Sequence, residues 1–87
     1  MVKPIEIKTL DNFKLWLKFS DGIEGVADLE SVAGKGVFKV FEEPGFFSKA
    51  YIAYNGNAIA WNEELDVDAL NLYLEITGKK FEEIKNL

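Results

Sequence analysis

The run YIAYNGNAIAW, residues 51–61, contains Asn55-Gly56 between two apolar segments. Asn-Gly in this setting is the strongest short-range signal for a β-hairpin, because both residues tolerate the positive φ angles of a tight turn. A two-residue loop here predicts three facing pairs: Tyr54 with Asn57, Ile52 with Ile59, and Ala50 with Trp61. One face of the hairpin is then bulky, and the other carries small residues that would let a helix approach closely.

Upstream of this hairpin, residues 3–28 alternate apolar and polar residues as β-strands do. The clearest strand runs from Phe13 to Phe19, and turn signals at residues 11–12 and 20–22 separate it from a strand on either side. The outward positions of this central strand are Lys14, Trp16 and Lys18. We therefore predict a three-stranded antiparallel meander, with Gly25 as a candidate β-bulge in its last strand.

The segment from residue 29 to residue 47 has a less regular pattern, because three glycines and one proline interrupt it. We expect one or two short helical turns there, which would carry large apolar side chains over an open face of the sheet. These side chains are Val37, Phe38, Phe41, Phe46 and Phe47.

The last periodic segment predicts a helix that is capped by Asp66, runs to about Thr77 and stops at Gly78. Its apolar residues cover roughly 220° of the circumference, about twice what an ordinary surface helix needs. We therefore expect the helix to be covered on two sides, one by the sheet. The second cover is either a second protein chain or the C-terminal segment with Phe81, Ile84 and Leu87.

Together these elements predict one small α+β domain over residues 1–87. Its antiparallel sheet comprises the three-stranded meander and the C-terminal hairpin, packed by one main helix and short helical turns. A chain of 87 residues with 48% hydrophobic and 29% charged residues can build one core and stay soluble. No apolar stretch approaches the roughly 18 residues needed to span a membrane, so we expect a cytoplasmic protein without membrane contact.

Several residue types that carry chemistry are absent from this sequence. It contains no cysteine and no histidine, and all ten of its basic residues are lysines. Thiol chemistry, zinc–thiolate sites and a Ser-His-Asp triad are thereby excluded. Ten lysines against fifteen acidic residues give a net charge of -5, which is the wrong sign for binding a phosphate backbone. We expect no direct binding of nucleic acid.

The remaining motifs support no catalytic, metal or cofactor site. Gly34-Lys35-Gly36 lacks the glycine and the hydroxyl residue that a phosphate loop requires. The acidic run over residues 62–68 does not fit the ligand spacing of a calcium loop and is better explained as a solvated turn with a helix cap. No pair of carboxylates is singled out by its spacing. We therefore predict a protein that is not an enzyme and binds no metal or cofactor.

Trp16 is the strongest candidate for a contact with another protein. Strand alternation turns its indole to the face opposite Leu15 and Leu17, between Lys14 and Lys18. Exposed tryptophan is a frequent anchor of protein interfaces, although the segment over residues 29–47 or the C-terminus would bury it if either covered that face. The edge of the predicted helix supplies two further candidates, Leu72 and Ile76.

Taken in order, these segments resemble a bacterial family, the domain of unknown function 2442. The resemblance rests on the Pro4-Ile5 strand, the strand that ends in Phe19-Ser20-Asp21-Gly22, the Asp28-Leu29 return, Phe38 and Phe47, Ile59-Ala60-Trp61, and the acidic Leu65-Asp66 segment before the helix. It implies a small α+β domain that is sometimes joined to a helix-turn-helix domain. It also implies a gene often found beside that of another small protein, in what look like toxin–antitoxin pairs.

We therefore predict a non-catalytic protein-interaction module. Its partner would be a small basic protein, which this chain neutralises as an antitoxin does, or a second copy of the chain in a homodimer. The alternative is a regulatory or ligand-sensing domain that acts with a DNA-binding partner, and it predicts an apolar pocket under residues 36–47. A carboxylate enzyme is the third hypothesis, and it requires two acids that converge in a cleft.

Overall fold

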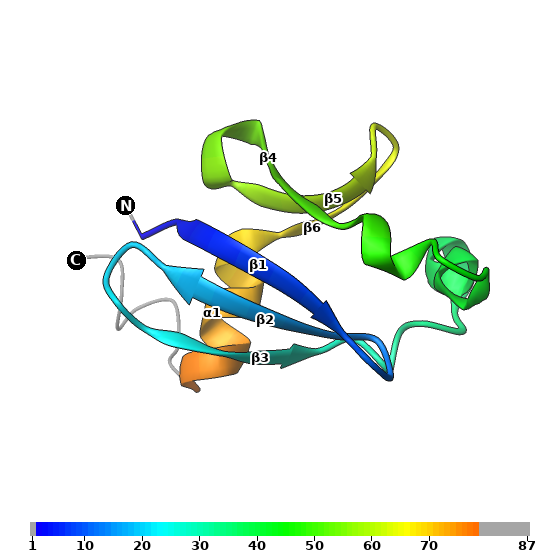
Figure 1. The fold of residues 1–87 in the computed structure, drawn as a ribbon, viewed down its shortest axis with the longest axis horizontal. Coiled ribbons are helices and arrows are strands. Elements are labelled where there is room, and N and C mark those ends of the chain that lie inside the picture. Colours follow the sequence, from blue (N-terminus) through cyan, green and yellow to red (C-terminus); the bar gives the residue numbers. More distant parts are fainter. Residues whose placement is uncertain (1, 79–87) are drawn as a thin grey trace.

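The computed structural model describes residues 2–78, which form two antiparallel sheets, one α-helix and three short 3-10 segments (Figure 1). Sheet A comprises β1 (Pro4–Leu10), β2 (Lys14–Phe19) and β3 (Glu24–Asp28). Sheet B comprises β4 (Tyr51–Ala53), β5 (Ala58–Asn62) and β6 (Leu65–Asp68), and α1 (Ala69–Thr77) follows it. The 3-10 segments are η1 (Gly36–Glu42), η2 (Phe47–Lys49) and η3 (Tyr54–Gly56). The predicted α+β fold is confirmed.

Sheet A is the predicted meander, in strand order β1-β2-β3. Alternation along β2 buries Leu15 and Leu17 completely and turns the residues between them outward. The predicted bulge at Gly25 is wrong, because Gly25 pairs with Leu17 in an uninterrupted register. The irregular pairing lies instead in β1, between Pro4 and Glu6. Gly25 is needed for a different reason, which is the close approach of α1.

Sheet B contains the predicted hairpin and one additional strand. Ile52 pairs with Ile59, as predicted from the position of the turn. Asn55 (φ 58°, ψ 33°) and Gly56 (φ 88°) have the two positive φ angles of a type I′ turn, which is closed by a 3.1 Å hydrogen bond from the Asn57 N–H to the Tyr54 carbonyl.

The start of α1 corrects the predicted cap. Asp66 is not the N-cap, because residues 65–68 form strand β6 and Asp66 pairs with Ala60. The cap is Asp68, whose carboxylate accepts a 3.1 Å hydrogen bond from the Leu70 N–H. Leu-Asp-Val-Asp alternates apolar and polar residues, so it satisfies the period of a strand when β5 lies beside it. The helix ends at Gly78 (φ 71°), as predicted.

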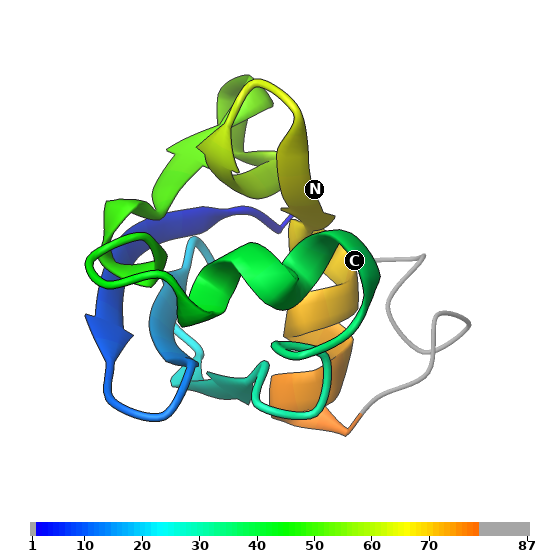
Figure 2. The ribbon, with the colours of Figure 1, turned by 90° about the vertical axis from the view of Figure 1, so that its right-hand side faces the viewer.

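The core lies between the two sheets, with α1 on one side and η1 across one end (Figure 2). Phe41 of η1 is buried at the centre of a cluster of aromatic rings. Its ring packs against those of Phe13, Phe38, Phe46, Phe47 and Trp61. The Trp61 indole N–H donates a 2.9 Å hydrogen bond to the Phe47 carbonyl, which leaves this buried donor satisfied. Short helical turns carrying phenylalanines were therefore predicted correctly for this segment. Val37, which was expected to pack over the sheet with them, is instead 71% exposed.

α1 is tied to sheet A by its side chains as well as by packing. The Tyr73 hydroxyl donates a 2.6 Å hydrogen bond to a carboxylate oxygen of Asp21, in the turn between β2 and β3. This bond, together with burial and the negative charge of Asp21, raises the pKa of Tyr73 to about 12. At the other end of β3, the Asp28 N–H donates to the Glu75 carboxylate over 3.1 Å. Sheet A thus covers one side of α1.

The predicted second cover of the helix is not tested by these residues. Phe81, Ile84 and Leu87 lie outside the described part of the chain, so the choice between the C-terminal segment and a second chain stays a prediction.

Candidate interaction surface

The acidic side chains of residues 2–78 form no cluster typical of a metal site. No group of three or more Asp or Glu side chains in this range is placed to hold a metal ion. No charged side chain there is buried, so none is desolvated in a cleft. No helix within the same range is long and apolar enough to cross a membrane.

The outward side of sheet A, which we call the Trp16 face, is the first candidate. The strand register places three residues of each strand on it: Glu6, Lys8 and Leu10 from β1, Lys14, Trp16 and Lys18 from β2, and Glu24, Val26 and Asp28 from β3. Three lysines and three carboxylates balance one another on this face. Trp16 occupies its centre, and it belongs neither to the hydrophobic core nor to the described side chains packed against it.

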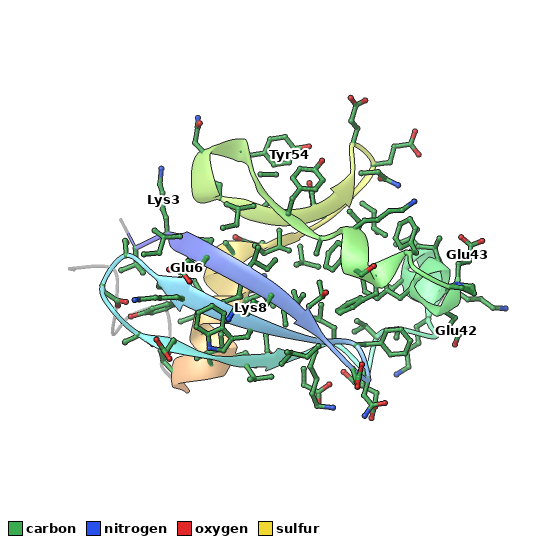
Figure 3. All side chains as sticks on the ribbon, viewed as in Figure 1. Lys3, Glu6, Lys8, Glu42, Glu43 and Tyr54 are labelled. Atoms are coloured by element: carbon green, nitrogen blue, oxygen red, sulfur yellow. The ribbon has the colours of Figure 1, made fainter. Side chains whose placement is uncertain are left out.

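The neighbours of Trp16 hold its indole at the surface. Lys8 lies directly across the strand pair on one side, and its ammonium nitrogen is 5.1 Å from the centre of the indole, within range of a cation–π interaction. Val26 lies directly across on the other side and leaves 47% of its surface exposed. Lys14 forms a weak 4.0 Å ion pair with Asp28. Trp16 is therefore a half-buried aromatic ring with charged side chains around it, among them Glu6 and Lys8, which are labelled in Figure 3.

The structure places the five interface residues predicted from the sequence in two separate locations. Trp16, Lys14 and Lys18 lie together on the Trp16 face, as alternation predicts. Leu72 is buried in the core, and Ile76 packs against Gly25 of β3 between the helix and sheet A. These two helix residues are not part of the Trp16 face, and as interface residues they stay a prediction.

Lys8, Val26 and Leu10 were missed by the sequence reasoning. The signal that identifies them is the strand register. Once the turns at residues 11–13 and 20–22 are known, counting back from each turn places Lys8 and Val26 opposite Trp16.

The ligand-sensing hypothesis requires an apolar pocket under residues 36–47. Phe41 of this segment packs against the rings of Phe38, Phe47 and Trp61. An open hollow of about 380 Å³ is lined by Phe41, Phe47 and the turn between β1 and β2. A second open hollow, of about 320 Å³, lies between Phe38 and α1 and is also lined by Asp68, Asn71 and Glu75. Its apolar lining comes from Leu29, Val32, Phe38, Val67 and Leu72.

The fold and the surface define a small α+β domain with a tryptophan-centred, outward-facing sheet. The chain belongs to the family described as protein of unknown function (DUF2442), whose model matches residues 4–78 and thus all six strands and α1. This confirms the resemblance drawn from the sequence. Searches of curated proteins and of solved structures found no match.

Proposed function

We propose that this protein is a non-catalytic protein-interaction module, the antitoxin-like partner of a small basic protein, and that the Trp16 face makes the contact. The observation that carries the proposal is the position of Trp16, which lies on the outward side of sheet A and outside the core.

The composition of the Trp16 face supports this role. Interfaces concentrate their binding energy in a few aromatic residues near the centre, surrounded by side chains that exclude water. Trp16 has the central position, Val26 and Leu10 extend the apolar area, and flexible lysines form the rim. A tryptophan of this kind contributes about 2 kcal/mol or more to binding, which corresponds to a loss of about 30-fold in affinity on truncation.

Charge supports the choice of a basic partner. The net charge of -5 attracts a positively charged protein during diffusional encounter and repels nucleic acid.

The test is purification of the tagged protein from its native cell, followed by mass spectrometry of what accompanies it. Trp16→Ser is compared with Val37→Ser, which removes an apolar side chain that is 71% exposed but lies on η1, away from the Trp16 face. We expect one small basic protein in near-stoichiometric amount with the wild type and with Val37→Ser, and its loss with Trp16→Ser.

Two results would contradict the proposal. One is a wild-type protein that returns without a partner, or as a homodimer that Trp16→Ser dissociates. The other is loss of the folded state in Trp16→Ser, measured by chemical denaturation, because that would place Trp16 in the core.

A further inference from the structure

Sheet B has an outward face that differs in chemistry from the Trp16 face. Tyr51 pairs with Ala60 and Ala60 with Asp66, while Ala53 pairs with Ala58 and Ala58 with Asp68. Paired residues of antiparallel strands share a face, so the tyrosine, the alanines and both aspartates lie on one side of sheet B. Ile52, Ile59 and Val67 alternate with them and point to the core.

The hairpin carries two large exposed aromatic side chains, Tyr51 on this side of the sheet and Tyr54 in the β4–β5 turn. Tyr51 is 44% exposed and Tyr54 is 55% exposed, whereas Ala58 and Ala60 on the same side are buried. Figure 3 shows the Tyr54 side chain directed from the β4–β5 turn back over the strands. Tyr54 has a φ of +53°, which is costly for an aromatic residue. We call Tyr51, Tyr54, Asp66 and Asp68 the tyrosine face.

Carboxylates outnumber basic side chains in the part of the chain that forms the tyrosine face. Residues 50–78 contain no lysine and five carboxylates, namely Glu63, Glu64, Asp66, Asp68 and Glu75. Glu63 and Glu64 lie in the turn between β5 and β6, beside the face. Two lysines adjoin this part of the chain: the aliphatic carbons of Lys3 lie beside Gly56, and Lys49 precedes Tyr51 by two residues. The Trp16 face, in contrast, has as many lysines as carboxylates.

We propose that the tyrosine face binds an arginine- or lysine-rich segment of the basic partner. Exposed tyrosine rings bind the alkyl stem and the cation of such a side chain, and Asp66 and Asp68 accept its N–H groups. A second copy of the chain would bring negative charge against negative charge, so a basic segment is the occupant that the charge selects. The identity of the partner rests on the proposed function, but the location and chemistry of the face do not.

The test uses the full chain and a synthetic hexa-arginine peptide, with hexa-glutamate as the control peptide. Amide chemical shifts are followed by NMR during titration at moderate salt. We expect shifts concentrated in β4, η3, β5 and β6 with hexa-arginine, and none with hexa-glutamate. Residues 6–28, which include the Trp16 face, should change little.

Matched variants separate the face from general charge attraction. Asp66→Asn and Glu42→Gln each remove one negative charge, but Glu42 lies at the end of η1. We expect Asp66→Asn to weaken hexa-arginine binding about 2- to 5-fold and Glu42→Gln by less than about 1.5-fold. Tyr54→Asn should weaken it about 3-fold or more, because asparagine tolerates the left-handed backbone but has no ring. Tyr51→Thr keeps a strand-forming residue and provides a second ring deletion.

Equal weakening by Asp66→Asn and Glu42→Gln, or shifts spread over every carboxylate of residues 2–78, would overturn the inference. The amide spectrum of each free variant verifies that it is folded. The peptide titration requires no cellular partner. It therefore tests binding at the tyrosine face even if no partner is found by purification from the native cell. Conversely, a partner captured equally by wild type and Tyr54→Asn would preserve the proposed function and contradict this inference.

Discussion

Gly25 shows how one residue without a side chain determines the position of a helix. A Cβ atom at this position would lie 2.6 Å from the Cγ2 atom of Ile76, closer than two carbon atoms can approach. We predict that Gly25→Ala lowers the free energy of unfolding by about 1–3 kcal/mol, because α1 must move away from β3. Chemical denaturation measures this loss. In an Ile76→Ala background the obstructing methyl group is gone, and Gly25→Ala should then cost little. Equal losses in both backgrounds would contradict this explanation.

Tyr73 gives the protein a pH-dependent stability at alkaline pH. Its pKa is raised from 10.0 to about 12, so the folded state favours the protonated hydroxyl that donates to Asp21. This contribution is complete below pH 10 and is lost as the pH rises towards 12. We predict that Tyr73→Phe is less stable than wild type by about 1–2 kcal/mol at pH 7. The difference between the two proteins should shrink between pH 10 and pH 12, as measured by urea denaturation at each pH. A constant difference would show that the hydroxyl does not titrate in this way.

At the scale of elements, the boundary between β6 and α1 is set by Asp68. Its carboxylate caps the helix, whereas Asp66 lies in a strand with its side chain outward. We predict that Asp68→Ala lowers the free energy of unfolding by about 0.5–2 kcal/mol, while Asp66→Ala changes it by less than about 0.5 kcal/mol. Asp68→Asn is the matched control, since asparagine also caps a helix. If chemical denaturation shows a larger loss of stability for Asp66→Ala than for Asp68→Ala, Asp66 is the N-cap instead.

At the scale of the whole molecule, Phe41 packs against residues of sheet B and residues beside sheet A, which are far apart in the sequence. Its ring packs 4.6 Å from that of Trp61 in sheet B and 6.4 Å from that of Phe13 beside sheet A, measured between ring centres. We predict that Phe41→Ala costs about 3–5 kcal/mol, because it leaves a cavity where both sheets meet. Both sheets should then unfold together, as followed by circular dichroism and by amide exchange. Loss of order limited to residues 36–49 would show that this segment is not part of the common core.

Whether a feature could be predicted from the sequence depends on how far apart in the chain the interacting residues lie. Alternation placed Trp16, Lys14 and Lys18 on one face, and Asn55-Gly56 gave the register of the hairpin, since both signals act between neighbours in the chain. The width of the apolar surface on α1 could not distinguish a residue that faces sheet A from one that faces a partner. Leu72 and Ile76 were for that reason candidates for an interface, although they pack within the molecule.

The sequence by itself determined the three strands and two tight turns of sheet A, the β4–β5 hairpin and the end of the helix at Gly78, because periodicity and turn chemistry are local. Only the tertiary structure decided that residues 65–68 form a strand rather than the start of the helix, because that outcome needs β5 as a partner. It also decided that Gly25 leaves room for Ile76 and that Tyr51 and Asp66 share a face, with Ala60 between them. Each of these depends on contacts between residues far apart in the chain, which no local pattern encodes.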